Sequence, residues 1–203
     1  MISIPSVIEV TSRGERILDV QSRLLRDRTI IVNGEIDDDL SNSVCMQLLY
    51  LETTNPEKKI RMYINSPGGS VTSGMAIYDT MQYIQPVVET VITGIAASMA
   101  SVIAQSGSPN NRFIMNNARV MIHQPLGSVT GSVSDAEITY KEMLYYKNLI
   151  AGLYAEHNSA NKDEGYFVTL MDRDSYFGAQ DAIEMGIVDS VLEKKQAYSF
   201  PRG

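Results

Sequence analysis

The chain contains one cysteine, two histidines and no tryptophan among its 203 residues. A single cysteine excludes an internal disulfide and suits a reducing compartment, so we expect a cytoplasmic protein. Cys45 shares one predicted helix face with Val44, Leu48 and Leu51, which favours a small buried apolar role. The two histidines and the cysteine lie far apart in the sequence, with no pair at metal-ligand spacing, so we expect no metal site.

Basic runs and long apolar runs are also missing. The 17 lysines and arginines against 24 aspartates and glutamates give a net charge of −7, which argues against nucleic acid as a partner. No apolar stretch approaches the roughly 18 residues that cross a bilayer, so we expect no membrane span. Residues 1–10 show no secretory pattern. No Gly-x-x-x-x-Gly-Lys motif is present, so we expect no nucleotide or other cofactor.

The remaining composition is that of a globular protein, with 44% hydrophobic and 20% charged residues. Strand-like and helix-like segments alternate with short connections, which predicts a single α/β domain. Residues 1–18 show no clear periodicity, with a polar loop at 12–16, and residues 158–170 look irregular. We expect strands at 29–32, 59–64, 88–93, 112–115, 119–122 and 187–192, and helices at 40–52, from 71, 100–105, 134–157 and 179–185.

Ser98 lies where a predicted buried strand gives way to a predicted helix. Gly94 marks the end of that strand, and the neighbours of Ser98 are small: Ala96, Ala97 and Ala100. A helix N-terminus offers unpaired N–H groups and partial positive charge beside the hydroxyl, which suits a nucleophile. An alternative interpretation is that Ser98 only caps the helix.

A serine nucleophile needs a base, and the chain offers two histidines. His157 ends the longest predicted helix, where a cation would favour the helix dipole, so we interpret it as structural. His123 ends an apolar strand, 25 residues after Ser98, and one helix and two strands between them can return it to the serine. The acid that orients the base is sought at Asp172 and Asp174, which also fit a surface ion cluster.

The pair Gly68-Gly69 forms a second glycine-rich turn between a strand and a helix. It is either a plain turn that requires positive φ, or a source of a backbone N–H for an oxyanion together with the N–H of Met99.

Taken together, these segments resemble the ClpP family, the serine peptidase subunit of the ATP-dependent caseinolytic protease. The resemblance covers roughly residues 5–193 in the family's order. Its most specific stretches are Ser66-Pro67-Gly68-Gly69, Ala96-Ala97-Ser98-Met99, His123-Gln124-Pro125-Leu126-Gly127 and Arg173-Asp174.

This resemblance implies an α/β fold of the ββα-spiral type shared with crotonases, with a protruding handle helix at about 134–157. It implies an axial-pore segment at 1–18, a peptidase domain at 19–193 and a C-terminal tail at 194–203. It also implies two stacked heptameric rings, a tetradecamer, that enclose the catalytic sites and receive unfolded protein substrates from a hexameric Clp-type AAA+ ATPase.

The resemblance also assigns roles to individual residues. Ser98 would be the nucleophile, His123 the base and Asp174 the orienting acid, while Gly69 and Met99 would supply the oxyanion N–H groups. The strand-like stretches Gly69-Ser70-Val71 and Pro125-Leu126-Gly127 would pair with substrate backbone. The apolar docking pocket for the ATPase would include Tyr63, Tyr83 and Met115.

Departures from the family pattern keep an alternative in view. Ala100 stands where the family has glycine, and residues 127–132 lack a glutamine that the family uses at the ring–ring contact. We expect an active serine endopeptidase; the alternative is a weakly active structural ring subunit that needs an active paralogue in mixed rings. A crotonase-like acyl-CoA enzyme fits poorly, because it would not need Ser98 and His123 in these motifs.

Overall fold

The computed structural model describes residues 5–11 and 14–193, which fold as an α/β structure around a mostly parallel sheet. The sheet has seven strands in the described residues, and its main path runs β3-β4-β5-β6-β9. These strands are β3 (Thr29–Asn33), β4 (Ile60–Ser66), β5 (Val88–Ala97), β6 (Arg112–Ile114) and β9 (Ser190–Val191). Two further strands, β7 (Arg119–Ile122) and β8 (Ser175–Phe177), continue from β5, and β7–β8 is the antiparallel pair.

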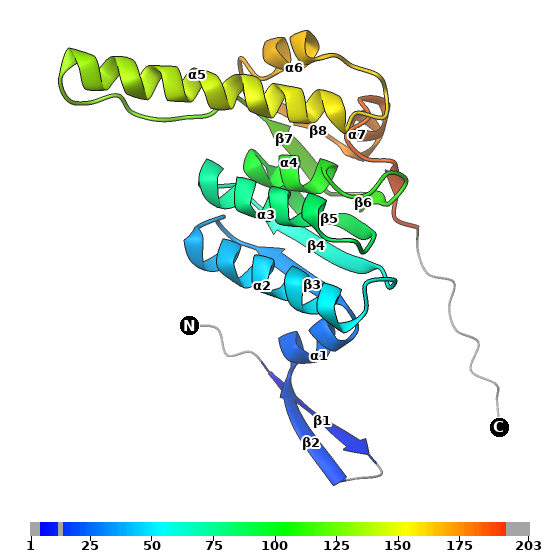
Figure 1. Cartoon of the computed structure of the whole chain (residues 1–203). Helices are drawn as coiled ribbons and strands as arrows, with labels where there is room; N and C mark the ends of the chain where they lie inside the picture. Colours follow the sequence, from blue (N-terminus) through cyan, green and yellow to red (C-terminus); the bar gives the residue numbers. More distant parts are fainter. Residues whose placement is uncertain (1–4, 12–13, 194–203) are drawn as a thin grey trace.

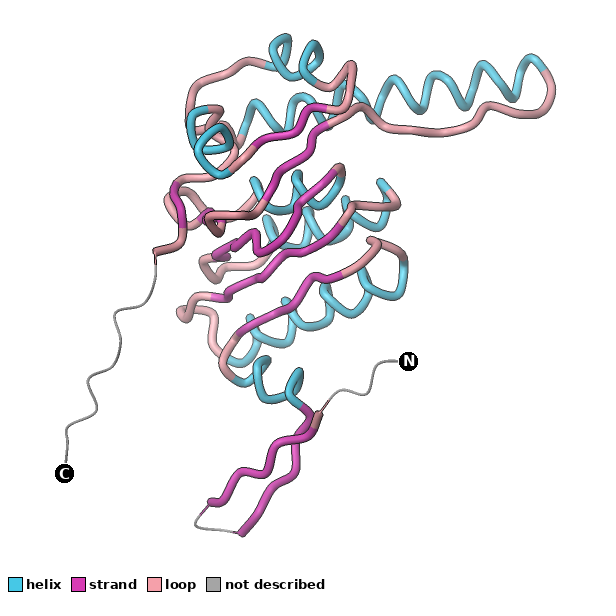
Figure 2. The backbone as a smooth tube through the Cα atoms, turned by 180° about the vertical axis from the view of Figure 1, so that it is seen from behind, coloured by secondary structure: helices cyan, strands magenta, loops and turns pink. Residues whose placement is uncertain are grey.

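Helices cover one face of this sheet (Figure 1). They are α2 (Asp38–Thr54), α3 (Val71–Tyr83) and α4 (Met99–Gln105). Ile30, Val32, Met62 and Ile64 alternate along β3 and β4 and are fully buried in the core that these helices complete. On the other face no helix of the described chain lies over β3 and β4 (Figure 2). The alternate positions of these strands are therefore half-buried or, at Asn33 and Asn65, exposed.

β5 is longer than the sequence predicts, and Gly94 does not end it. Between the pairs Ile64↔Ile92 and Ser66↔Ala96, β5 carries two extra residues, which is a β-bulge. A side chain at Gly94 would collide with Asn65, whose Oδ1 accepts a hydrogen bond from Ile95 N at 3.1 Å. The first half of β5 pairs with β6 and the second half with β7, so the bulge redirects the strand towards β7.

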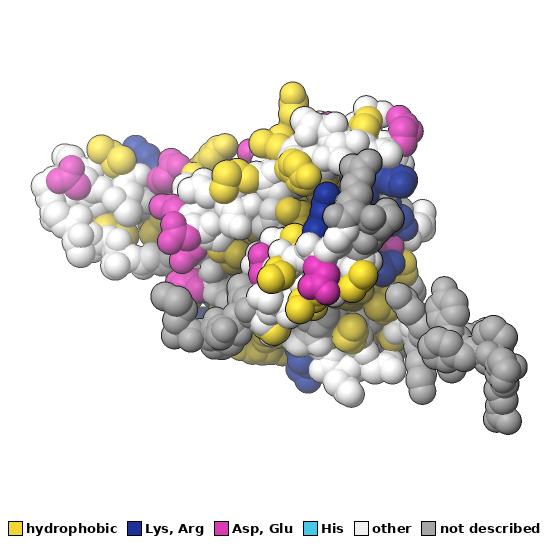
Figure 3. All heavy atoms as spheres, turned by 90° about the horizontal axis from the view of Figure 1, so that it is seen from below, with side chains coloured by type: hydrophobic (Ala, Val, Ile, Leu, Met, Phe, Trp, Pro, Cys, Tyr) yellow, Lys and Arg dark blue, Asp and Glu magenta, His cyan; other side chains and the backbone are white. Residues whose placement is uncertain are grey.

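The long helix α5 (Val133–Glu156) agrees with the predicted handle and projects from the body (Figures 1 and 3). Ser132 and Asp135 form a capping box at its start, which fixes where it begins. Its outer part exposes apolar side chains, and its last turns are buried in the core through Ile150, Ala151 and Tyr154. The exposed apolar residues of the helix are Val133, Ile138, Tyr140, Leu144 and Tyr145.

The expectation that residues 158–170 are irregular is wrong. They include helix α6 (Glu164–Leu170), which Asp163 caps by accepting from Tyr166 N at 2.8 Å. A seven-residue helix with one buried side chain, Phe167, carries too little periodicity to be recognised. Helix α7 (Ala179–Glu184) follows as predicted, whereas β9 is much shorter than the expected strand.

The N-terminal residues have regular structure that the sequence did not suggest. Strands β1 (Ser6–Thr11) and β2 (Gly14–Asp19) form an antiparallel hairpin, followed by α1 (Val20–Arg26), and the hairpin extends away from the body (Figure 1). The expected loop at 12–16 is wrong for 14–16, and residues 12–13 lie outside the described residues. So do residues 1–4 of the predicted pore segment and the tail at 194–203. No helix in the described chain has the length and apolarity needed to cross a membrane.

Two residues interpreted as structural have different surroundings from those expected. Cys45 is half-buried rather than buried, with Sγ 3.4 Å from Ala76 O and 3.4 Å from Thr80 Oγ1. His157 follows α5, and its Nε2 lies 2.9 Å from the Tyr78 hydroxyl. Burial lowers the pKa of His157, so the expected cation at this helix end is wrong and the ring is neutral near pH 7.

Candidate active site

Ser98 occupies the sharp turn between β5 and α4. Its φ of 53° lies in the left-handed region, which few residues other than glycine adopt and which costs about 1–3 kcal/mol. Its side chain makes no capping hydrogen bond to α4, so the capping interpretation is wrong. The Ser98 Oγ instead lies 2.9 Å from His123 Nε2. The strained turn therefore presents the hydroxyl to a histidine and away from the helix.

The register between β5 and β7 explains how His123 reaches Ser98. Ala97 is the partner of Met121 in this parallel pair, and Ser98 N donates to Met121 O at 2.9 Å. His123 follows the last residue of β7, one position beyond the level of Ser98. Neighbouring parallel strands thus end together and place the two side chains at one sheet edge.

Asp174 reaches His123 through the antiparallel pair of β7 and β8. Ile122 is the partner of Ser175, so His123 and Asp174 extend the same ladder by one position. The Asp174 Oδ1 lies 3.2 Å from His123 Nδ1. The histidine side chain is 13% exposed and the aspartate side chain 60%, so solvent reaches the site from the aspartate side.

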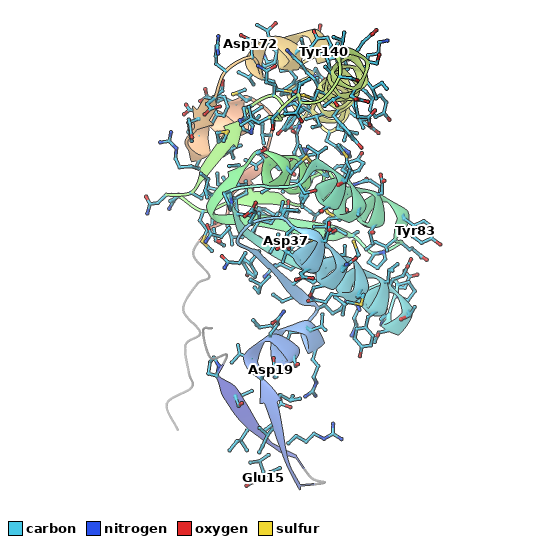
Figure 4. The ribbon with its side chains drawn as sticks, turned by 90° about the vertical axis from the view of Figure 1, so that its left-hand side faces the viewer. Glu15, Asp19, Asp37, Tyr83, Tyr140 and Asp172 are labelled. Atoms are coloured by element: carbon cyan, nitrogen blue, oxygen red, sulfur yellow. The ribbon has the colours of Figure 1, made fainter. Side chains whose placement is uncertain are left out.

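Asp172 takes no part in this chain of hydrogen bonds. Its backbone carbonyl accepts from Gln124 Nε2 at 3.0 Å, and its carboxylate lies 3.9 Å from Arg173 Nε. Figure 4 shows Asp172 at the outer end of the molecule, near α6. Of the two aspartates, the structure brings to the histidine only Asp174, the one that the family resemblance implied.

Gln124, for which the sequence predicts no individual role, ties the site together. Its backbone N–H donates to Met171 O at 2.7 Å, in addition to the side-chain bond to the Asp172 carbonyl. These two bonds fasten the end of β7 to the segment that carries Asp174. The signals in the sequence are its position directly after His123 and its place in the family stretch that begins there.

The glycine turn after β4 lies against the nucleophile. A Cβ at Gly68 would approach Ala97 O to 2.6 Å and Ser98 Cβ to 2.7 Å, so no side chain fits there. Gly69 forms a bridge to Ile36: Ile36 N donates to Gly68 O and Ser70 N donates to Ile36 O, each at 2.8 Å. This pairing turns the N–H of Gly69 away from Ile36.

Two backbone donors near Ser98 remain without an acceptor. Within the described chain, the N–H groups of Gly69 and Met99 make no hydrogen bond. Met99 is the first residue of α4, where an unpaired N–H is inherent to the helix. Both are therefore able to donate to an anion that forms beside Ser98.

The two predicted substrate-binding segments are not strands in this structure. The expectation is wrong for Val71, which is the first residue of α3, while Ser70 caps this helix by accepting from Ser73 N at 3.3 Å. Pro125, Leu126 and Gly127 form no regular structure, and Leu126 is 80% exposed. The backbone of 125–127 is therefore unpaired in the described chain.

The three residues expected in a docking pocket come from different elements. Tyr63 lies in β4 and points to the sheet face without helices, and Met115 directly follows β6 with 37% exposure. Tyr83 ends α3 and is 79% exposed; Figure 4 shows it pointing away from the body. The structure thus places the three residues in β4, at the end of α3 and directly after β6.

No group of three or more metal-ligating side chains is present among the described residues. The arrangement of Ser98, His123 and Asp174 suits nucleophilic chemistry without a metal ligand set.

Comparison with protein-family models gives a match to the family described as Clp protease, over residues 12–195 of the 203-residue chain. The matched region includes every strand of the seven-stranded sheet, the long helix α5, and Ser98, His123 and Asp174. The chain therefore belongs to the Clp protease family.

Proposed function

We propose that this chain is a serine endopeptidase in which Ser98, His123 and Asp174 act as a catalytic triad. The observation that carries the proposal is the continuous contact from Ser98 Oγ to His123 Nε2 (2.9 Å) and from His123 Nδ1 to Asp174 Oδ1 (3.2 Å). Membership of the Clp protease family supports a peptidase. Ser98 supplies the nucleophile, His123 the base and Asp174 the group that fixes the tautomer of the base.

The reaction would proceed through an acyl-enzyme. The Ser98 Oγ attacks the carbonyl carbon of the scissile bond while its proton passes to His123 Nε2. The C–N bond then breaks, and the same proton leaves with the amine product. A water molecule next gives a proton to His123 and attacks the ester, which releases the acid product and returns the proton to Ser98.

The oxyanion in each half-reaction would be held by Gly69 and Met99. Their N–H groups have no acceptor in the described chain, so no internal hydrogen bond must break first. Gly68 supports this role indirectly, because the absence of a side chain lets the Gly69 N–H approach the nucleophile. Removing one such donor in other serine peptidases costs roughly 10²–10³ in kcat.

The substrate would lie along the unpaired backbone of Pro125, Leu126 and Gly127. An extended peptide can add to such a segment by strand pairing, with Gly69 and Ser70 on its other side. Because Ser70 N already donates to Ile36 O, that side offers fewer free donors than a full strand. Backbone pairing accepts many sequences, which suits unfolded protein substrates.

We also propose that the chain works within a ring-shaped chamber. The family implies a self-assembling proteolytic complex that works with ATPases. The exposed apolar side chains of α5 support a contact between copies, because an isolated helix would not keep them in water without a partner. Two stacked heptameric rings, with α5 between them and the hairpin β1–β2 at the pore, would enclose the serines.

The test combines size with activity. Size-exclusion chromatography with mass measurement separates the assembled and single-chain forms, and each peak is assayed with a fluorogenic peptide. The proposal requires hydrolysis in the large form of the wild type, and none with Ser98→Ala of the same size. Hydrolysis that is equal in the two proteins would contradict it. Assembly without any hydrolysis would favour the structural ring subunit.

A further inference from the structure

The hydroxyl of Tyr154 is a buried group near the nucleophile turn, and the triad does not use it. Tyr154 lies in the last turns of α5 and is 1% exposed. Its hydroxyl oxygen is 2.6 Å from Ser101 Oγ, and its carbonyl accepts from Gln105 Nε2 at 2.9 Å. Ser101 and Gln105 both belong to α4, so this tyrosine fastens the base of α5 to the helix that begins at Ser98.

Ser101 passes this contact to the turn itself. Its Oγ lies 2.6 Å from Ser98 O and 3.0 Å from Met121 O. A hydroxyl has a single proton, so Ser101 donates to one carbonyl, the nearer being that of Ser98, while its oxygen accepts from Tyr154. Burial raises the pKa of Tyr154, so its phenol keeps its proton and remains a donor.

The carbonyl that receives this bond belongs to the peptide group whose N–H is that of Met99. A peptide group is planar and trans, so its C=O and N–H point in opposite directions, and fixing one direction fixes the other. A hydrogen bond to the carbonyl also polarises the group and strengthens its N–H as a donor. The Ser98 carbonyl also accepts from Ser101 N at 2.9 Å and Val102 N at 3.4 Å, so the Tyr154–Ser101 contact adds a third bond that fixes where the Met99 N–H points.

We propose that Tyr154 and Ser101 are positioning residues for the Met99 oxyanion donor, acting through the 98–99 peptide group. The proposal rests on the function proposed above, in which this N–H stabilises the oxyanion. It links the base of the long helix to the chemistry of Ser98 by a hydrogen-bonded chain from Tyr154 through Ser101 to the Ser98 carbonyl.

The hydroxyl can be removed without disturbing the ring of Tyr154. The ring stacks on Phe167, with centroids 5.3 Å apart and planes inclined by 20°, and Tyr154→Phe preserves this packing. Ser101→Ala removes the other hydroxyl. Each single variant leaves the other hydroxyl without this partner in the core, which can destabilise the fold. The double variant removes both hydroxyls and so avoids this cost. Tyr166→Phe, on α6, is the matched control, because that ring is 37% exposed.

The experiment compares the full-length variants on a fluorogenic peptide and measures inhibition by a peptide aldehyde, which binds serine peptidases as a tetrahedral adduct. For Tyr154→Phe we expect kcat to fall about tenfold with KM unchanged, less than the roughly 10²–10³ for loss of a donor itself. Aldehyde affinity should fall by the same factor, and Tyr166→Phe should match the wild type. Ser101→Ala and the double variant should show no more than an additive loss.

A purely structural role would lower stability or raise KM without this parallel loss of kcat and aldehyde affinity. If folded Tyr154→Phe, or the folded double variant, retains wild-type kcat and aldehyde affinity, the positioning role is wrong while the peptidase assignment stands. If the wild type itself shows no hydrolysis that depends on Ser98, the proposed function fails, and the positioning role fails with it.

Discussion

At the scale of single residues, the site depends on a serine held in a backbone conformation that serine rarely adopts. The N–H of Ser98 donates to Met121 O, and its carbonyl accepts from Ser101 N and Val102 N. These bonds compensate the cost of the positive φ and aim the hydroxyl at His123. Among the side chains of Ser98, His123 and Asp174, that of the aspartate is the most exposed. Replacing Asp174 is therefore the most informative test of these three residues.

The two aspartates near His123 should differ sharply when each is replaced. Asp174→Asn keeps the shape but favours the wrong histidine tautomer, and kcat for a short peptide should fall by up to roughly 10⁴, as in other triads. Asp172→Asn, whose carboxylate does not reach the histidine, should stay within about threefold of the wild type, because it removes only an exposed charge. Steady-state kinetics at matched assembly state provides the measurement. Equal kcat for Asp174→Asn and the wild type would exclude Asp174 as the orienting acid.

His157 should make stability depend on pH. Its pKa is lowered in the folded chain, first by burial and also by the positive charge of Arg112, while Glu156 opposes the shift. The unfolded chain therefore binds a proton first, near its ordinary pKa of about 6.5. The stability that the neutral ring provides is complete above this pH and is lost as pH falls towards the folded pKa.

We therefore expect the melting temperature of the wild type, relative to His157→Gln, to be constant from pH 8 to 7 and to decrease from pH 6.5 to 5. Thermal unfolding at one protein concentration measures this difference, in which the other titrating groups cancel. A difference that grows as pH falls would mean that the folded chain favours the charged ring.

At the scale of elements, strand register brings the site together. The bulge in β5 directs its second half to β7, and the β7–β8 ladder then aligns His123 with Asp174. The glycine turn after β4 closes the site from the other side. Close contact between this turn and Ser98 is possible only because Gly68 has no side chain.

Gly68 and Gly34 offer a matched pair for testing that contact. Both have φ of 87°, but a Cβ at Gly34 meets nothing within 4 Å, whereas a Cβ at Gly68 collides with Ala97 and Ser98. Gly34→Ala should therefore cost only the conformational strain, about 1 kcal/mol, with activity retained. Gly68→Ala should lose a further 1–3 kcal/mol or so, and most peptidase activity. Denaturant unfolding and peptide kinetics measure both effects; comparable behaviour of the two variants would contradict the close approach.

The sequence allowed most of this arrangement to be predicted where periodicity or a motif is strong. The strands around Met62, Ile92 and Val120, and the long helix, follow directly from apolar patterns. Periodicity failed at the short helix α6 and at the hairpin β1–β2, whose side chains are mostly exposed and so carry no alternation. The extension of β5 beyond Gly94 could not be predicted, because the bulge depends on a contact with Asn65 from another strand.

The residues of the site likewise divide into those that the sequence indicates and those that only the fold brings together. Ser98 and His123 could be found from their motifs, and the family's Arg173-Asp174 pair indicated Asp174. Without that resemblance, the choice between Asp172 and Asp174 depends on the β7–β8 register, which local periodicity does not encode. The contact between Tyr154 and Ser101 joins residues 53 positions apart, and nothing in either segment indicates it.

At the scale of the whole molecule, the described chain has two projections from its body, the hairpin β1–β2 and the helix α5 (Figure 1). Each exposes apolar side chains, among them Ile8, Val10 and Ile17 in the hairpin and Ile138 in the helix. Such surfaces suit contacts with other copies or with a partner protein.

We expect the assembled chain to cleave short peptides alone and to digest a folded protein only with a hexameric Clp-type ATPase and ATP. Unfolding a domain requires roughly 5–15 kcal/mol, and the sequence contains no motif for nucleotide hydrolysis. Tyr63→Ala, on the open sheet face, should weaken digestion of a tagged folded reporter far more than peptide cleavage. Rapid digestion of the reporter by the purified chain alone would show that the serines are not enclosed.

The central claim, that Ser98 is the nucleophile activated by His123, is tested most directly by covalent labelling with a fluorophosphonate probe followed by mass spectrometry of the digested chain. Our account predicts one label per chain, on Ser98, with loss of peptidase activity in proportion to labelling and no label on Ser98→Ala. His123→Ala should slow the labelling by several orders of magnitude. Labelling of Ser101 or Ser70, or undiminished labelling of Ser98→Ala, would contradict the account.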